Sequence, residues 1–235
     1  MKMQDSIKLA QLSDGYRYNS DSLLLADFVL EMGIKNQVLE VGSGCGIIGI
    51  LLKKFVSNLD LSLLDIQQEN IELIHRNLKQ NNIQAGVLHE DFRNFQNDKK
   101  FDFIVCNPPF YRDGAHEGKN THKNISKFQK YLTLNEFIVR SNALLKPMGV
   151  LYFCYEALAL DKICLVLESK KLKLTKIRFV HTHQNISARL VLVQARKSVK
   201  SPCEILPPFF IYKNENLSEQ MQEIHSRFRL ESYDI

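Results

Sequence analysis

A glycine-rich segment, Glu40-Val-Gly-Ser-Gly-Cys-Gly46, lies between an apolar run and a helical pattern. Glycines at such a turn let the backbone approach a ligand closely, and the start of the helix offers free N–H groups. The spacing Gly44-x-Gly46-x-x-Gly49 matches the dinucleotide-binding pattern, and Asp65, 21 residues after Gly44, could then hold a ribose. These residues alone allow an NAD-dependent enzyme, and a tight structural turn would also explain the glycines.

Three acidic positions favour a different ligand. Glu40, before the glycines, would repel a pyrophosphate but could hold an ammonium group. Asp65 can accept hydrogen bonds from two ribose hydroxyls, and Asp91-Phe92 offers a carboxylate and an aromatic ring where an adenine would lie. Together these groups suit a nucleoside that carries a cationic amino acid and no phosphate.

With these residues the sequence resembles the class I S-adenosylmethionine-dependent methyltransferases over about residues 37–195. The resemblance implies S-adenosyl-L-methionine as the cofactor, and we expect no metal ion. It also implies the cofactor-binding residues, which are Glu40, Gly42, Ser43, Gly44, Cys45, Gly46, Asp65, Ile66, Asp91, Phe92 and Asn107.

The tetrapeptide Asn107-Pro108-Pro109-Phe110 directly follows the apolar run Phe101–Cys106. Ligands of open α/β sheets bind beyond the carboxyl ends of the strands, so the tetrapeptide should face the same crevice as the glycines. The prolines fix φ and remove two N–H donors, so the Asn107 side-chain oxygen and the Pro108 carbonyl can accept both hydrogens of an NH₂ group. Phe110 can stack on the ring that carries the amine.

These four residues are therefore the candidate catalytic residues. Orientation and acceptors for the developing charge would suffice for catalysis, because a sulfonium is already a good leaving group. The tetrapeptide is similar to the N-P-P-[FY] motif of methyltransferases that act on exocyclic or amide nitrogens. A Pro-Pro turn that closes a strand is the plain structural alternative.

Strand-like and helix-like segments alternate along the chain, which predicts an α/β fold. We expect a Rossmann-like, doubly wound, mostly parallel seven-stranded sheet with an antiparallel terminal hairpin. The expected strands are Gln37–Val41, Leu59–Asp65, Ala85–His89, Phe101–Cys106, Val150–Cys154, Leu172–His181 and Ala188–Ala195. The expected helices are Asp21–Met32, Ile47–Val56, Gln68–Gln80, Asn135–Leu145, Leu158–Ser169 and Leu217–Phe228.

No linker divides the chain, so residues 1–235 are expected to form a single methyltransferase domain. Residues 1–36 would form an N-terminal cap, 37–196 the catalytic core, and 197–235 a C-terminal strap and helix. Residues 111–124 are polar and lack a period, which predicts an irregular loop beside the catalytic tetrapeptide.

Composition excludes several classes of protein. No apolar run approaches the ~18 residues that a membrane span needs, and the N-terminus lacks the apolar region of a secretory signal. The five cysteines are odd in number and never form a CxxC pair, which argues for a reducing cytoplasm and against disulfides or structural zinc. We expect them to be buried small residues, and His181-x-His183, which lacks a third ligand, to be a polar strand end.

Positive charge is concentrated in the middle of the chain. Residues 119–200 contain 16 Lys and Arg against 4 Asp and Glu, a net charge of +12. Residues 1–118 have a net charge of −4 and residues 201–235 a net charge of −3. This middle third predicts a polyanionic partner such as RNA, with phosphates at Lys119, Lys123, Lys127 and Lys130. Solvated lysines on exposed surfaces are the alternative.

Both ends of the chain extend the resemblance. Gln11–Leu25 is similar to the opening segment of the small bacterial family that methylates an adenine beside the anticodon of valine tRNA. Ala188–Val193 and Leu206-Pro-Pro-Phe-Phe-Ile-Tyr212 look like the final strand and the tail of that family. The resemblance implies tRNA as the partner and N6 of an adenine as the methyl acceptor. The segment His116–Lys123 departs from the Ala-Arg-His-like run that is usual there.

Other functions remain open from the sequence. A glutamine-N5 methyltransferase of a protein such as a release factor carries the same motif, and so does an rRNA guanine-N2 methyltransferase. The glutamine enzymes usually have a helical domain before the glycines, whereas only 36 residues precede the first core strand here. A non-enzymatic RNA-binding module with a decayed methyltransferase fold is the third possibility, and the intact acidic, glycine and tetrapeptide set argues against it.

Overall fold

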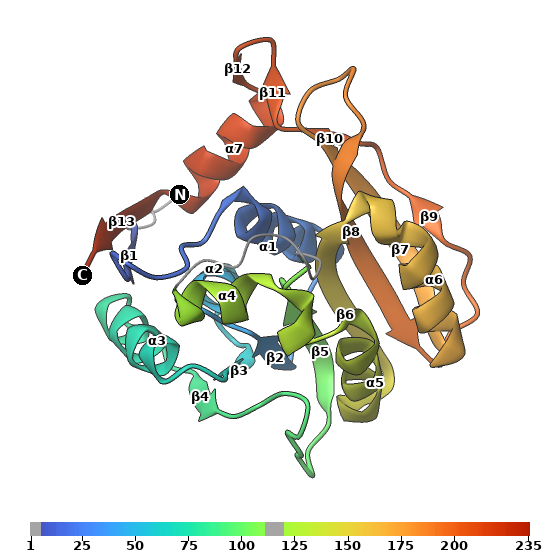
Figure 1. Ribbon diagram of the computed structural model, residues 1–235, viewed down its shortest axis with the longest axis horizontal. Helices are drawn as coiled ribbons and strands as arrows, with labels where there is room; N and C mark the ends of the chain where they lie inside the picture. Colours follow the sequence, from blue (N-terminus) through green and yellow to red (C-terminus); the bar gives the residue numbers. More distant parts are fainter. Residues whose placement is uncertain (1–5, 111–119) are drawn as a thin grey trace.

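A nine-stranded sheet with helices on both faces forms the centre of the protein (Figure 1). The computed structural model describes residues 6–110 and 120–235. The helices are α1 (Ser20–Met32), α2 (Ile47–Phe55), α3 (Gln68–Gln80), α4 (Thr121–Lys127), α5 (Leu134–Leu144), α6 (Leu160–Ser169) and α7 (Glu219–Phe228), with short 3₁₀ turns η1 (Gln129–Tyr131) and η2 (Ala157–Ala159).

The strands of the central sheet include the seven that the sequence predicts. These are β2 (Gln37–Val41), β3 (Asp60–Asp65), β4 (Gly86–His89), β5 (Phe101–Cys106), β6 (Leu145–Glu156), β7 (Leu172–His181) and β8 (Ala188–Lys197). The order along the sheet is β10-β7-β8-β6-β5-β2-β3-β4. β8 is antiparallel to β6 and β7, whereas the pairs among β2 to β6 are parallel.

The predicted fold is therefore confirmed, with one addition. The C-terminal strap contributes two short strands, β9 (Glu204–Ile205) and β10 (Phe209–Phe210), and both pair with β7 in parallel. A further small hairpin, β11 (Tyr212–Lys213) with β12 (Asn216–Leu217), lies before α7. Sequence reasoning missed these pairings because segments of two residues have no measurable period.

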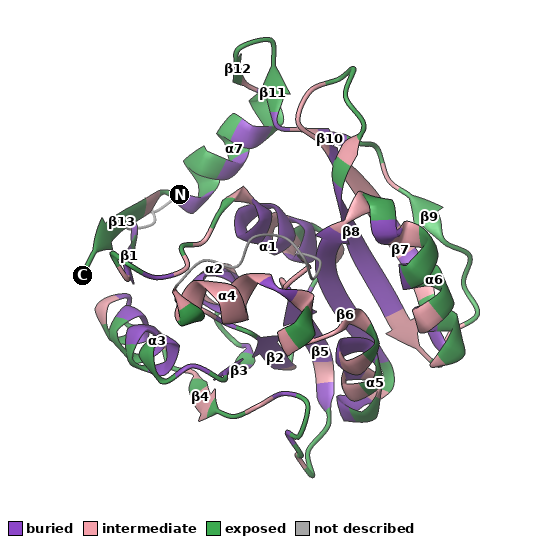
Figure 2. Cartoon of the chain, viewed as in Figure 1, coloured by how far each residue is buried: buried purple, intermediate pink, exposed green. Residues whose placement is uncertain are grey.

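Alternate residues of the central strands belong to two different hydrophobic cores. Val38 and Leu63 pack with α1, α2, α3 and α7, whereas Leu39 and Leu64 pack with α5 and α6. This alternation explains why the strands read as continuous apolar runs, since both faces of the sheet are covered. Figure 2 shows the buried residues along β5, β6, β7 and β8.

The two ends of the described chain lie side by side. β1 (Ile7–Gln11) pairs in parallel with β13 (Leu230–Asp234), which no local pattern predicts. α3 supports this pair, because Asn77 Oδ1 accepts from Ala10 N at 2.8 Å and Asn81 Oδ1 accepts from Lys8 N at 3.0 Å. The segment after β1 is therefore tied to α3 before it reaches α1.

Two sequence-based expectations were wrong. Residues 121–124 belong to α4 rather than to an irregular loop, while residues 111–119 of that expected loop lie outside the described ranges. Cys164 and Cys203 are exposed, whereas Cys45, Cys106 and Cys154 are buried as expected. α4 escaped prediction because none of its residues is buried, so it has no apolar face to produce a helical period.

Several features bear on possible ligands. His181 and His183 pack against the rings of Phe210 and Tyr212 at 5.4 and 5.3 Å between centroids. Among the described residues, no three His, Cys, Asp or Glu side chains gather closely enough to hold a metal ion. No helix in residues 6–110 and 120–235 is long and apolar enough to cross a membrane.

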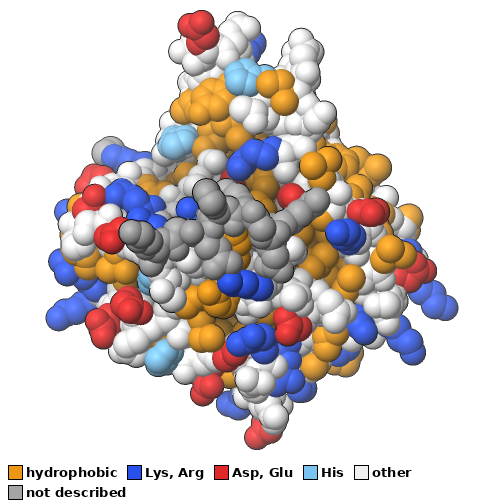
Figure 3. Space-filling model, viewed as in Figure 1, with side chains coloured by type: hydrophobic (Ala, Val, Ile, Leu, Met, Phe, Trp, Pro, Cys, Tyr) orange, Lys and Arg blue, Asp and Glu red, His pale blue; other side chains and the backbone are white. Residues whose placement is uncertain are grey.

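Acidic side chains from other parts of the chain neutralise part of the basic middle third. Lys and Arg side chains are interspersed with Asp and Glu on the face that carries α4 (Figure 3). Ion pairs between described basic residues of the middle third and acidic residues elsewhere include Lys123–Asp14, Lys146–Asp102, Lys176–Glu204, Arg178–Glu31 and Arg189–Asp21. The net charge of +12 is therefore not one continuous basic surface.

Candidate active site

The glycine segment makes a left-handed turn between β2 and α2. Gly42, Gly44 and Gly46 have φ of +64°, +56° and +80°, a region that side chains with a Cβ rarely adopt. Gly49, one turn into α2, is glycine for a steric reason. A Cβ there would lie 2.4 Å from a methyl carbon of Leu63 and 2.5 Å from Oε2 of Glu40. The segment thus brings helix backbone directly against a carboxylate.

Glu40 is buried at the end of β2, with 1% of its surface exposed. Its Oε2 accepts a hydrogen bond from Gly49 N at 2.7 Å. Burial raises the pKa of Glu40 to about 8, and the Gly49 N–H opposes this shift. Near neutral pH the carboxyl group is therefore largely protonated, and a cation beside it would favour the ionised form.

Asp65 ends β3 beside the glycines. Its Oδ2 accepts from Gly44 N at 2.8 Å, and its Oδ1 accepts from Gln67 N at 2.9 Å and from Asn70 Nδ2 at 3.0 Å. Burial raises the pKa of Asp65, while these three donors lower it. The donors fix the direction of the carboxylate, and each of its oxygens has more than one lone-pair site.

Asp91 and Phe92 follow β4 with different degrees of exposure. The Arg93 guanidinium donates to both oxygens of Asp91 at 2.6 to 3.0 Å, and these bonds hold the pKa of Asp91 below its ordinary value. Phe92 is almost fully buried and packs against Phe137 at 6.1 Å between ring centroids. Both residues line the same cavity as Glu40 and Asp65.

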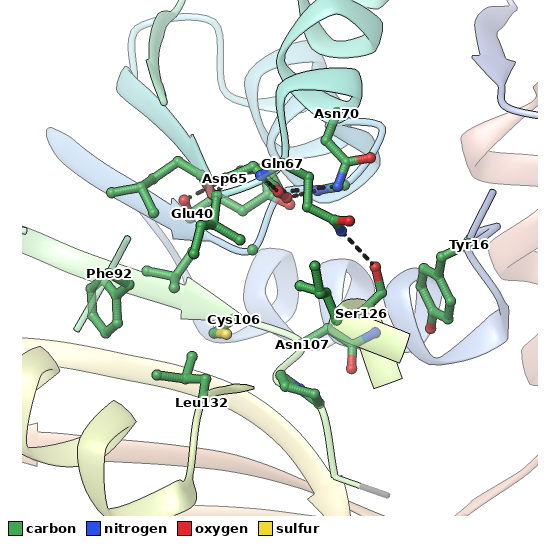
Figure 4. Close-up of a pocket in the computed structure, with 18 of the residues that line it drawn as sticks. Tyr16, Glu40, Asp65, Gln67, Asn70, Phe92, Cys106, Asn107, Ser126 and Leu132 are labelled. Atoms are coloured by element: carbon green, nitrogen blue, oxygen red, sulfur yellow. Dashed lines mark hydrogen bonds between the residues drawn. The ribbon is translucent and has the colours of Figure 1, made fainter. Parts of the chain in front are cut away.

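This cavity has a volume of about 310 Å³ and opens at the carboxyl ends of β2, β3 and β5. Glu40 and Asp65 lie beside each other in it, while Asn107 lies near Ser126 in another part of the cavity (Figure 4). Eleven of the sequence-predicted site residues line it: Glu40, Gly42, Ser43, Gly44, Cys45, Asp65, Ile66, Asp91, Phe92, Asn107 and Pro109. The prediction from separate motifs therefore converges on one cavity.

The remaining predicted residues lie just outside the cavity. Gly46 is the N-cap of α2, and its φ of +80° rather than lack of space favours glycine, since a Cβ would make only ordinary 3.5 Å contacts with Ile50 and Ile74. Pro108 and Phe110 line a second cavity of about 370 Å³, and Phe110 packs against Tyr155 at 5.8 Å between ring centroids. Gly46 thus serves the turn, whereas Pro108 and Phe110 face a neighbouring space.

Asn107 and Pro109 line both cavities, so the tetrapeptide is a wall common to the two. The side-chain amide of Asn107 has a defined orientation. Its Nδ2 donates to Ser22 Oγ at 3.2 Å, and its Oδ1 accepts from the Cys154 thiol at 2.9 Å. The oxygen keeps a second lone pair, so it can accept one more hydrogen bond.

Sequence reasoning missed a group of cavity residues that come from outside the core motifs. They are Tyr16, Tyr18, Ser22, Gln67 and Asn70, together with Ile125, Ser126, Tyr131 and Leu132. Gln67 and Asn70 follow Asp65 closely in the chain, whereas the others belong to the N-terminal segment or to residues 125–132, far from the core motifs in sequence. The similarity of Gln11–Leu25 to a known opening segment was the signal for the first three, whereas α4 gave no signal at all.

A comparison with protein families decides the class. The model of the methyltransferase small domain matches residues 17–158, which include both the glycine turn and the tetrapeptide. The chain belongs to this family. It is an S-adenosylmethionine-dependent methyltransferase.

Relatives and solved structures agree with this membership. The chain is 22% identical over 184 residues to a tRNA1(Val) (adenine(37)-N6)-methyltransferase of Aliivibrio fischeri, covering 77% of this chain and 78% of that protein. It is 38% identical over 79 residues to a ribosomal RNA small subunit methyltransferase C of Haemophilus influenzae, covering 33% of this chain but 23% of that protein. The crystal structure of a predicted O-methyltransferase from Agrobacterium tumefaciens shares the fold, with a TM-score of 0.69, 16% identity and coverage of 92% and 100%.

Proposed function

We propose that this chain methylates the exocyclic amino group of a nucleobase in RNA, and that the acceptor is N6 of an adenine in tRNA. The observation that carries this proposal is the position of Asn107. It lies on the wall between two cavities, and Ser22 and Cys154 fix its amide so that Oδ1 remains an acceptor. An amine in one cavity would thus meet the cofactor in the other.

The polar and aromatic groups that line the first cavity fit S-adenosylmethionine. Asp65 would accept from the ribose hydroxyls, since three protein donors already fix its carboxylate. Asp91 and Phe92 would border the adenine, and Ile66 and the glycine backbone would lie along the nucleoside. The buried Glu40 would lose its proton beside the ammonium group of the amino acid, because a cation offsets the penalty of burying its charge.

Bound S-adenosylmethionine supplies an electrophilic methyl group on a sulfonium. Asn107 Oδ1 and the Pro108 carbonyl would accept the two hydrogens of the amine, which aims the nitrogen lone pair at that methyl carbon. As the nitrogen gains positive charge in the transition state, both oxygens would stabilise it. Phe110 would stack on the base in the second cavity, and Pro109 would keep the backbone rigid between them.

Cations at the second cavity favour a polyanionic substrate. Arg17, Lys123 and Lys127 line it next to the tetrapeptide, together with Tyr16. The relatives that the chain resembles over most of its length are named as tRNA adenine-N6-methyltransferases. An RNA nucleotide, with its base against Phe110 and its phosphates near Lys123 and Lys127, therefore suits this space best.

The decisive experiment identifies the methylated nucleoside. Purified protein would be incubated with methyl-labelled S-adenosylmethionine and unmodified bacterial tRNA, and the digest would be analysed by mass spectrometry. We expect N6-methyladenosine in a tRNA that carries the valine anticodon. Asn107→Ala should produce at least ~10²-fold less product at the same protein concentration.

Other products would assign the same site to another substrate. The H. influenzae relative is named as a ribosomal RNA methyltransferase, so methylguanosine from 30S subunits is the first alternative to measure. Methylated glutamine in a release factor would indicate the protein-modifying class. Failure to bind S-adenosylmethionine in calorimetry would contradict the proposed cofactor site.

A further inference from the structure

His122 on α4 is connected to the cofactor cavity by a continuous chain of hydrogen bonds. Its Nδ1 accepts from Tyr16 N at 3.1 Å, so this nitrogen carries no proton. Its Nε2 lies 2.9 Å from Asn70 Oδ1 and donates to it, and Asn70 Nδ2 donates to Asp65 Oδ1 at 3.0 Å. The network thus requires the neutral imidazole with its proton on Nε2.

α4 is a wall of both cavities and depends on such polar contacts for its position. Ile125 lines the first cavity, Lys123 and Lys127 line the second, and Ser126 lines both. None of the seven residues of α4 is buried, and the buried apolar side chain next to the helix is its C-cap, Phe128, so polar contacts hold the rest of the helix. Ser126 Oγ accepts from Gln67 Nε2 at 3.1 Å, which is a second link to the residues that follow Asp65.

The N-terminal segment is attached to the same helix. Besides the Tyr16 N–H, Asp14 accepts from Lys123 Nζ at 2.9 Å, and its carbonyl accepts from Asn120 Nδ2 at 2.6 Å. Gly15 lies against the ring of His122, since a Cβ there would be 3.3 Å from Cε1. His122 therefore lies where the N-terminal segment, α3 and α4 meet.

We propose that His122 is a positioning residue that couples occupancy of the cofactor cavity to occupancy of the second cavity. Through Asn70 it holds Asp65 in the direction needed for the ribose, and through α4 it fixes the side chains that line the substrate side. A bound cofactor would order this shared wall, so a substrate that binds afterwards avoids the cost of ordering it. The substrate half of this proposal rests on the function proposed above.

The charges around His122 determine its response to pH. Asp65 at the end of β3 and Glu69 on α3 favour its protonation, whereas burial and Lys123 on its own helix oppose it. Burial is the largest of these influences, and it lowers the pKa of His122 below its ordinary value. A proton on Nδ1 would face the Tyr16 N–H and break the link, so acidic pH should uncouple the two cavities.

Two variants separate the interactions of His122. His122→Ala removes both contacts, whereas the amide nitrogen of His122→Gln can replace Nε2 as donor to Asn70 and does not titrate. His75→Ala removes an exposed histidine of α3, and Thr121→Ala changes an exposed residue of α4, so both are matched controls. Thermal unfolding and circular dichroism of every variant show whether it is folded.

The first measurement uses S-adenosylmethionine alone, in calorimetry without RNA. We expect His122→Ala to weaken cofactor binding by about 5- to 20-fold, His122→Gln to recover most of the loss, and the controls to match the wild type. Between pH 7.5 and 5.5 the affinity of the wild type should fall more steeply than that of His122→Gln. Unchanged affinity in a folded His122→Ala would overturn the proposal, whatever the methyl acceptor is.

The second measurement tests coupling with tRNA. S-adenosylhomocysteine should tighten tRNA binding by at least ~5-fold in the wild type and leave it unchanged in His122→Ala. In the methylation reaction, His122→Ala should change kcat less than KM. If coupling persists in His122→Ala, the shared-wall proposal is wrong. If tRNA does not bind even to the wild type, the proposed substrate is wrong, while the cofactor measurement still decides the role of His122.

Discussion

The two walls of the site are held in place by different forces. The glycine turn and Glu40 belong to a buried strand-to-helix connection, in which steric contacts at Gly49 leave no room for a side chain. α4, on the opposite wall, has no buried residue and is held by hydrogen bonds to Asp14, Tyr16, Gln67 and Asn70. One wall is specified by packing and the other by polar contacts between distant segments.

This difference suggests that the two walls have different roles in binding. A packed wall keeps its geometry whether or not a ligand is bound, which suits a cofactor shared by many enzymes of this fold. A wall held by a few polar contacts can adjust at low cost, which suits the recognition of a particular substrate. The following changes would break or sharpen this comparison.

The largest effect should come from the pH dependence of Glu40. Its pKa is raised to about 8 in the folded protein, so the folded state binds more protons than the unfolded state between pH 4.5 and 8. Stability is therefore fully present below the unfolded pKa and is lost as pH rises through about 8, by as much as a few kcal/mol. Urea unfolding between pH 5 and 8.5 measures this loss.

Glu40→Gln provides the matched control, because it keeps an acceptor for Gly49 N and does not titrate. Its unfolding free energy should vary less over the same pH range. Saturating S-adenosylmethionine should also reduce the loss in the wild type, since the ammonium group would stabilise the ionised carboxylate. Identical pH profiles for the wild type and Glu40→Gln would show that Glu40 ionises normally.

Asn107→Ala tests the tetrapeptide, which lies between the two cavities. It removes the acceptor that we expect to orient the amine, so kcat should fall at least ~10²-fold, about 2.7 kcal/mol in the transition state. Cofactor affinity should change much less. Asn94→Ala, an exposed position, is the control, and near-full activity of Asn107→Ala would remove Asn107 from the catalytic role.

The agreement between the sequence-based predictions and the structure also differs between the two walls. The bounds of α3, β5 and β7 agree with the predicted ranges, because these elements have a strong period or end at turn residues. The cofactor-binding candidates come from one connection, the ends of neighbouring strands and the tetrapeptide, which a parallel sheet brings to a common edge. Local sequence patterns were therefore sufficient to predict which residues form the packed wall.

The other wall depends on contacts that no local pattern encodes. His122 belongs to the stretch that the sequence predicts to be an irregular loop, yet it is half-buried and bonded to residues 52 and 106 positions away. The β1–β13 pair joins the two ends of the described chain and anchors the segment that leads to Tyr16. Polar contacts of this kind leave no hydrophobic period, so they appear only once the fold brings the segments together.

Asp65→Ala should weaken S-adenosylmethionine binding by roughly 1.5–3 kcal/mol, through the loss of hydrogen bonds from the ribose hydroxyls to a charged acceptor. Asp65→Asn keeps the size and should show a smaller loss, and Asp60→Ala at the exposed start of β3 should show none. Calorimetry measures all three. An unchanged dissociation constant in Asp65→Ala would exclude it from the site.

The smallest effect should come from the cations beside the second cavity. Lys123→Ala with Lys127→Ala removes two groups that line it, so RNA binding should weaken and its log–log salt slope should flatten by up to ~2. Lys119, also predicted to contact phosphate, lies outside the described residues. Part of the effect at Lys123 is offset because it already pairs with Asp14.

Lys162→Ala with Lys173→Ala removes the same charge from exposed positions on α6 and β7, and it separates local contacts from net charge. If both double variants flatten the slope equally, RNA responds to the overall charge of the basic middle third. An effect confined to Lys123 and Lys127 places the phosphates at the polar wall. Cofactor affinity without RNA should change little in either, because S-adenosylmethionine brings no phosphate for these lysines to bind and the bonds of His122 to Asn70 and of Ser126 to Gln67 remain.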